Sequence, residues 1–144
     1  MTRHTEESAE LFEDFVNTLW RCAESDGYRV RKLYGQAQLL RIEGPRSATL
    51  NVRTDARTDA KKNRWWGFTK NVEKDLAKAE RKWFLVFLEA TQGEGYLLSD
   101  VEVASAKTRW DDADKQYIIH PHQLRELWKF RGVAQAWGRI KARL

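Results

Sequence analysis

The sequence predicts an α/β fold, with a central mixed β-sheet flanked by helices and a C-terminal helical tail. Segments with helical spacing of apolar residues alternate with short β-prone runs, and the apolar run 83–90 has the character of a strand covered on both faces. A chain of 144 residues has the usual length of one domain. We therefore expect a single domain over 1–144, with a core of about 5–124 and a helical extension over 121–144.

The first predicted element is an amphipathic helix over 5–24. Acidic side chains fill its early turns, where the helix dipole favours anions. Its apolar residues recur at helical spacing: Phe12, Phe15, Leu19 and Cys22. Because Cys22 is the only cysteine, no internal disulfide can form, which fits a reducing compartment.

Three strands are predicted after this helix: 28–34, 37–42 and 48–55. The turn-forming residues 43–46 predict a hairpin between the second and third strands. In the third strand apolar and polar residues alternate, so every second side chain projects from one polar face. That face carries Thr49, Asn51, Arg53 and Asp55.

The second half of the chain continues the alternation of strands and helices. A short aromatic strand or turn is predicted over 65–69 and a helix over 71–81, followed by three strands: 83–90, 96–99 and 117–120. Pro121 is predicted to begin the helical tail. The tail should dock through an apolar stripe and direct its basic residues to solvent; the stripe is Val133, Trp137, Ile140 and Leu144.

The charge pattern bears on partners and location. Basic residues are in excess over 28–82 and 125–144, which predicts a phosphate-bearing partner; an ordinary solvated surface is the alternative. No run approaches the length of a membrane span, and the first residues are polar and acidic, unlike a secretory leader. We expect a soluble, cytoplasmic protein with no membrane partner.

The order of helix, three strands, helix and two further strands resembles the restriction-endonuclease-like (PD-(D/E)xK) nuclease superfamily over about residues 10–124. Small prokaryotic members are similar in the apolar strand 83–87 and in the short Tyr-Leu-Leu strand that follows it. The resemblance implies that the family's second-strand aspartate falls at Gln38 and that its Glu-x-Lys falls at Asn51 and Arg53. The family's helix carboxylate matches Glu10 or Glu13.

These substitutions change the chemistry that the resemblance implies. In such nucleases two carboxylates hold a divalent cation that activates water. Amides at Gln38 and Asn51 are neutral, and Arg53 stays protonated and cannot act as a base. We therefore predict a catalytically degenerate site that binds a phosphodiester without a metal or cofactor and does not cut it.

A migrated carboxylate would restore an Mg²⁺ site and is the alternative. Asp55 shares the face of Asn51 and Arg53 and is the first candidate, with Glu13 as a helper; Glu43 and Glu89 are others.

A basic loop that runs into aromatic residues is the second candidate feature. Cations bind the nucleic-acid backbone, while exposed rings stack on bases. The predicted nucleic-acid-binding residues are Arg53, Arg57, Lys61, Lys62, Arg64, Trp65, Trp66, Lys70 and Lys74. Because Trp65 and Trp66 are adjacent on a strand, at least one of them should belong to the core.

Three functional hypotheses follow. The first is a nucleic-acid-binding module, with DNA as the expected partner, and the second is an active metal-dependent endonuclease with a rearranged site. The third is a protein-interaction subunit of a prokaryotic or phage defence system, and a homodimer is compatible with all three. A zinc site at His120 and His122 is not expected, because the only other histidine is His4.

Overall fold

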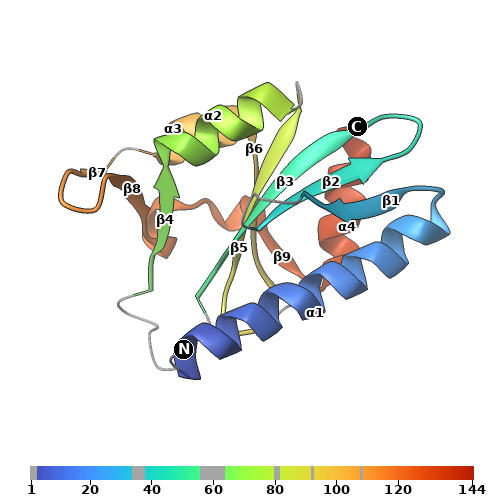
Figure 1. Ribbon diagram of the computed structural model, residues 1–144, viewed down its shortest axis with the longest axis horizontal. Coiled ribbons are helices and arrows are strands. Elements are labelled where there is room, and N and C mark those ends of the chain that lie inside the picture. Colours follow the sequence, from blue (N-terminus) through green and yellow to red (C-terminus); the bar gives the residue numbers. More distant parts are fainter. Residues whose placement is uncertain (1–2, 34–37, 56–63, 80–81, 92, 108) are drawn as a thin grey trace.

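The computed structural model describes residues 3–33, 38–55, 64–79, 82–91, 93–107 and 109–144 (Figure 1). The helices are α1 (Arg3–Ser25), α2 (Lys70–Ala79), α3 (Asp100–Ala106) and α4 (Val133–Ala142). The strands are β1 (Arg29–Lys32), β2 (Leu39–Glu43), β3 (Ala48–Thr54), β4 (Trp66–Thr69), β5 (Trp83–Leu88), β6 (Glu94–Ser99), β7 (Trp110–Asp111), β8 (Gln116–Ile119) and β9 (Lys129–Arg131).

The main sheet has six strands in the order β1-β2-β3-β5-β6-β9. The first three strands form an antiparallel meander, whereas β3 and β5 are parallel and are joined by a crossover that contains β4 and α2. The strands β5, β6 and β9 are again antiparallel. The predicted α/β class with a mixed sheet and flanking helices is thus confirmed.

Each face of the sheet is covered by its own apolar cluster. On one face α1 and α4 pack against the even-numbered side chains of β3, including Leu50 and Val52. On the other face α2, α3 and a small sheet of order β4-β8-β7 pack against residues such as Leu85 and Phe87. Figure 1 shows the two helix layers on opposite sides of the strands. All six residues of β5 are buried, as its apolar run predicts.

The predicted hairpin between the second and third strands is confirmed. Leu40 of β2 lies opposite Leu50 of β3, and the two strands are joined through residues 44–47. Gly44 lies in this turn, where an added Cβ would approach the ring of Tyr28 to 2.4 Å. Glycine therefore permits the close approach of the turn to the residue that precedes β1.

The prediction of a helix beginning at Pro121 is wrong. Residues 121–132 form two short 3-10 turns (Pro121–Gln123 and Glu126–Trp128) and then the edge strand β9. The main sheet provides β6 as a pairing partner for β9, and Phe130 is buried, so tertiary pairing overrides the local pattern. Gly132, at φ 92°, separates β9 from α4, whose predicted apolar stripe is buried.

Helix α3 was missed, although the sequence carries a signal for it. Ser99 and Glu102 form a capping box: the Ser99 hydroxyl accepts from the Glu102 N–H, and the Glu102 carboxylate accepts from the Ser99 N–H. A serine three residues before a glutamate is a known helix-start pattern. The strands β7 and β9 have only two and three residues, too few for periodicity to indicate them.

Candidate functional site

A pocket of about 530 Å³ lies at the carboxyl end of β3. Residues from four separate stretches of the chain line it, and they include several that the sequence singles out. The lining residues are Gln38, Arg53, Thr54, Asp55, Trp65, Trp66, Gly67 and Gln116. The fold thus brings two of the nuclease-like motif positions, Gln38 and Arg53, together with the aromatic pair.

Gln38 reaches the site because of the backbone between β1 and β2. It adopts a left-handed conformation (φ 61°) directly before β2. Its carbonyl oxygen accepts from the Val52 N–H at 3.0 Å and lies 3.5 Å from the Asn51 Nδ2. Two contacts to β3 therefore fix Gln38 beside the strand that carries Arg53.

Asn51 lies in the protein interior and does not line the pocket. It faces the α2 side of the sheet, opposite Leu39 and Leu85, and its side chain is fully buried. Its Oδ1 has no hydrogen-bond partner among the residues that the structure describes. A buried carbonyl without a partner carries a desolvation cost, so Asn51 is a polar defect in a mainly apolar layer.

Arg53 is the cation of the pocket. Two residues beyond Asn51 on the same face of β3, it is half-buried, and desolvation lowers the pKa of its guanidinium. Within the described part of the chain, no carboxylate or carbonyl accepts a hydrogen bond from it. Because arginine stays protonated at any physiological pH, the pocket holds a partly desolvated positive charge that no described residue neutralises.

Asp55 and Arg64 form a buried ion pair beside Arg53. The side chains of Asp55 and Arg64 are 4% and 6% exposed, and Arg64 Nη1 lies 3.8 Å from Asp55 Oδ2. The same nitrogen donates to the Asp55 carbonyl at 2.6 Å. The charge of Asp55, the first candidate for a migrated carboxylate, is therefore balanced by Arg64. Arg64, predicted to contact phosphate, lies in the interior instead of on an open surface.

The two adjacent tryptophans have different environments, as strand alternation requires. Trp66 is 2% exposed; its Nε1 donates to the Leu88 carbonyl at 3.1 Å, and its ring stacks on Phe87 with centroids 4.9 Å apart. Trp65 is 37% exposed and lines the pocket. The prediction that at least one of the pair belongs to the core is confirmed, and the other remains accessible.

Gln116 completes the pocket from β8, and sequence reasoning missed it. The pairing of β4 with β8 brings it beside Gly67, where an added Cβ would lie 2.0 Å from Gln116 Oε1. The absence of a side chain at Gly67 makes room for the glutamine amide. No local pattern marks Gln116, because the contact depends on a pairing between distant segments.

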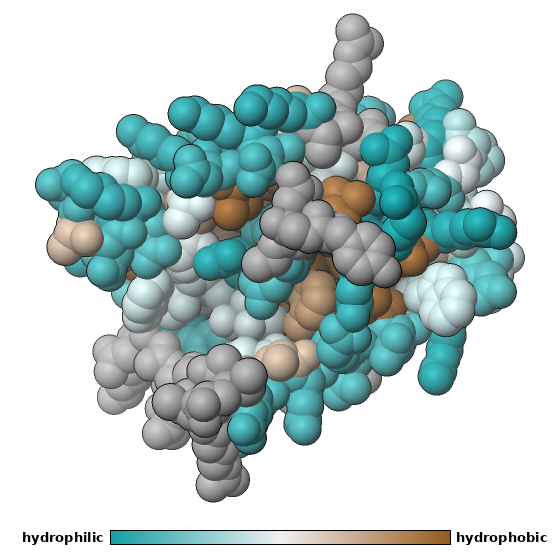
Figure 2. Space-filling view, viewed as in Figure 1, coloured by the Kyte–Doolittle hydropathy of each residue, from teal (hydrophilic) through white to brown (hydrophobic). Residues whose placement is uncertain are grey.

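The other predicted site residues do not gather at the pocket. Glu13 pairs with Lys32 of β1, on the α1 side of the sheet. Lys70 and Lys74 lie on α2, whose hydrophilic outer side is seen at the top of Figure 2; the Lys70 ammonium lies 4.6 Å from the ring centroid of Trp110. The predicted ligands Arg57, Lys61 and Lys62 lie outside the described residues.

The alternative carboxylates are also elsewhere. Glu43 pairs with Arg31 and Arg41, and Glu89 lines a neighbouring pocket with Arg64. In the described segments, no three His, Cys, Asp or Glu side chains are grouped so that they could hold one metal ion. The rings of His120 and His122 stack with centroids 5.4 Å apart.

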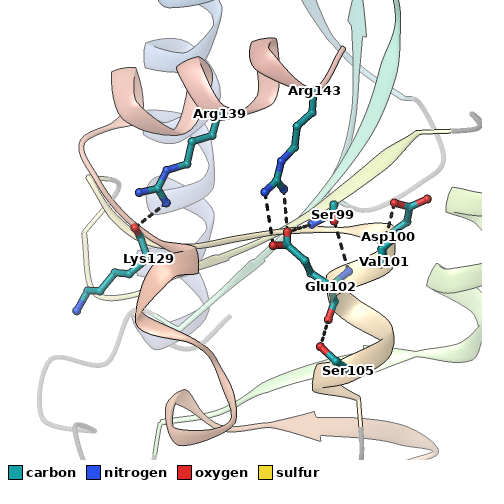
Figure 3. A network of polar contacts seen from close by, with 8 residues as sticks. All are labelled: Ser99, Asp100, Val101, Glu102, Ser105, Lys129, Arg139 and Arg143. Carbon is teal, nitrogen blue, oxygen red and sulfur yellow. Dashed lines mark hydrogen bonds and ion pairs between the residues drawn. The ribbon is translucent and has the colours of Figure 1, made fainter.

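The basic residues of the C-terminal helix are held by other parts of the protein (Figure 3). Arg143 contacts both carboxylate oxygens of Glu102, at 2.8 and 3.5 Å, and Arg139 donates to the Lys129 carbonyl at 2.7 Å. Partial burial raises the pKa of Glu102, but hydrogen bonds from Arg143 and the Ser99 N–H outweigh it and lower the pKa overall. Arg143 therefore links the C-terminal segment to α3, and Arg139 links α4 to β9.

Comparison with protein-family models, curated proteins and solved structures finds no match for this chain. None of the described helices is long and apolar enough to span a membrane.

Proposed function

We propose that the chain is a nucleic-acid-binding module, with DNA as its expected partner, that holds a backbone phosphate at Arg53 and does not cleave it. The observation that carries the proposal is the state of Arg53. It is half-buried at the wall of an open pocket, and the described residues offer it no acceptor. A partly desolvated cation without a partner is costly, and a bound anion removes that cost.

The chemistry of the pocket favours a phosphate over other anions. A guanidinium offers forked donors that match two phosphate oxygens, and hydrogen bonds between charged groups are about twice as strong as neutral ones. Gln38 and Gln116 add amide donors without adding negative charge. Asp55 contributes a carboxylate, but the adjacent Arg64 balances its charge.

The same arrangement supports the reading of a degenerate nuclease. The chain forms a helix, three strands, a helix and two further strands in the sequence order that suggested the resemblance, with β4 added before α2, and Gln38 and Arg53 line one pocket. With the Gln38 amide and the Arg53 guanidinium where the resemblance implies a carboxylate and a lysine, the pocket attracts phosphate more than a divalent cation.

The salt dependence of binding tests the proposal. With roughly four to six phosphates contacted, log affinity for duplex DNA should fall against log salt with a slope of about −4 to −5. Arg53→Gln should weaken binding about tenfold or more. Arg131→Gln removes the same charge from the exposed edge strand β9, outside the pocket, and should leave affinity nearly unchanged. A flat salt response, or equal effects of the two variants, contradicts the proposal.

An active endonuclease is the second candidate, because Asp55 lines the pocket. It predicts cleavage of DNA or RNA with Mg²⁺ or Mn²⁺ that Asp55→Asn abolishes. Asparagine is a better control than alanine here, because it fills the buried position and can still accept a hydrogen bond from Arg64. Cleavage that survives in Asp55→Asn points to a contaminating nuclease.

A further inference from the structure

We infer that the pocket at the end of β3 takes one unpaired nucleotide, with its phosphate on Arg53 and its base stacked on Trp65. This inference rests on the proposed phosphate site and narrows its substrate class. The preferred ligand is then a single strand, or a duplex that presents an unpaired nucleotide, and not a fully paired duplex.

Trp65 provides a free aromatic surface next to the cation. Its neighbour Trp66 has a ring partner in Phe87 and a hydrogen-bond acceptor in the Leu88 carbonyl. Trp65, by contrast, is 37% exposed, and no ring or cation among the described residues stacks on it. An exposed indole beside an arginine is the combination by which proteins hold the base and the backbone of single-stranded nucleic acid.

Two amides of the pocket are available for the edge of a base. No group in the described stretches forms a hydrogen bond with the side chain of Gln38 or of Gln116. Each amide offers both donors and an acceptor, the two functions that base edges require. The Gln116 amide can lie over β4 only because Gly67 has no side chain.

The size and shape of the pocket favour a single unpaired unit. Its volume of about 530 Å³ lies within the range of about 300–1,000 Å³ that is usual for small organic ligands. A base in a duplex has both faces covered by its neighbours and its pairing edge occupied. To stack on Trp65 and reach the amides, a base has to leave the stack or be unpaired already.

Four DNA ligands of one sequence test the inference: a single strand, a blunt duplex, a duplex with a one-nucleotide bulge, and the same bulge without its base. We expect the single strand and the bulged duplex to bind about tenfold more tightly than the blunt duplex. Removal of the base from the bulge should return the affinity to that of the blunt duplex. This arm uses the unchanged protein, so it does not depend on the folding of any variant.

Variants at two exposed tryptophans test whether Trp65 is the residue on which the unpaired base stacks. Trp65→Ala should weaken binding of the single strand and the bulged duplex about tenfold and leave the blunt duplex unchanged, whereas Trp65→Phe should retain most of the affinity. Trp20→Ala removes an exposed tryptophan of α1 that does not line this pocket, and it should change none of the four affinities.

The outcomes separate this inference from the proposed function. If the baseless bulge binds as tightly as the intact bulge, or Trp65→Ala weakens all four ligands equally, the nucleotide pocket is overturned. The phosphate site still stands in that case, provided that Arg53→Gln weakens every ligand. If Arg53→Gln weakens none of them, the proposed function itself fails.

Discussion

The pocket at the end of β3 and the contact between α3 and α4 use the same residue types in opposite ways. Between the helices, the guanidinium of Arg143 meets the carboxylate of Glu102, which also caps α3. In the pocket, Arg53 has no acceptor among the described residues. The contact between the helices satisfies its charged groups within the protein, whereas the pocket leaves the Arg53 guanidinium for a ligand.

This difference distinguishes a structural arginine from a binding one better than position in the sequence does. Arg139, Lys141 and Arg143 form a dense basic run, but each has a protein partner that uses its charge or its donors. Arg53 lies in a less basic segment and has none among the described residues. Polar groups left unsatisfied in a native structure call for an explanation, and a ligand provides one here.

The largest effect is expected at the ion pair that separates the pocket from the core. Asp55→Ala leaves the guanidinium of Arg64 buried without its carboxylate, which should lower the free energy of unfolding by about 3–5 kcal/mol. Urea unfolding monitored by tryptophan fluorescence measures this loss in the free energy of unfolding. The double variant Asp55→Leu with Arg64→Met removes both charges and should recover most of the loss. A small loss in Asp55→Ala would mean that the pair does not stabilise the pocket.

A smaller effect of opposite sign is expected at Asn51. The amide oxygen of Asn51 is buried and has no hydrogen-bond partner among the described residues. Asn51→Leu puts an apolar group of similar volume in its place, so the free energy of unfolding should rise by about 1–2 kcal/mol. Thr49→Val is a matched control on the same face of β3, because the Thr49 Oγ1 is also buried without a partner in the described segments. A loss of stability in Asn51→Leu with a gain in Thr49→Val would indicate that the Asn51 contact to the Gln38 carbonyl matters more than the orphaned oxygen.

The two arginines themselves give the most direct comparison. Arg53→Met removes a desolvated charge that has no acceptor in the described structure and should raise the free energy of unfolding by about 1 kcal/mol while weakening nucleic-acid binding. Arg143→Met breaks the ion pair with Glu102 and should lower the free energy of unfolding by up to about 1 kcal/mol without affecting nucleic-acid binding. Unfolding and binding measured on both variants check this. If both variants raise, or both lower, the free energy of unfolding, the distinction between a structural arginine at position 143 and a binding arginine at position 53 does not hold.

The sequence predicts elements well where one local pattern determines them. The spacing of α1, the alternation of β3 and the apolar run of β5 each predict their structure correctly, because each reports a buried face. The prediction for the C-terminal tail is wrong because no local pattern determines its structure. Residues 129–131 form a strand only because β6 provides an edge for pairing. The candidate site shows the same limit. Alternation predicts that Arg53 shares a face with Asn51 and that at least one of the two tryptophans belongs to the core, whereas Gln116 and the pairing of Asp55 with Arg64 depend on tertiary contacts.

The smallest effect, and the one that depends on pH, is expected at Glu102. Its pKa is lowered in the folded protein, so its ionised form stabilises the fold. That contribution is fully present above the unfolded pKa of about 4.3 and is lost as the pH falls through the lower folded value. Glu102→Gln keeps an acceptor for the Ser99 N–H but removes the charge, so it should cost less than about 1 kcal/mol at pH 7, because the pair with Arg143 is partly exposed. Urea unfolding of both proteins over a pH series from 7 downward should show a difference that is largest at pH 7 and shrinks as the Glu102 carboxylate is protonated. A difference that does not change with pH would show that the stabilisation is due to hydrogen bonding and not to the charge of Glu102.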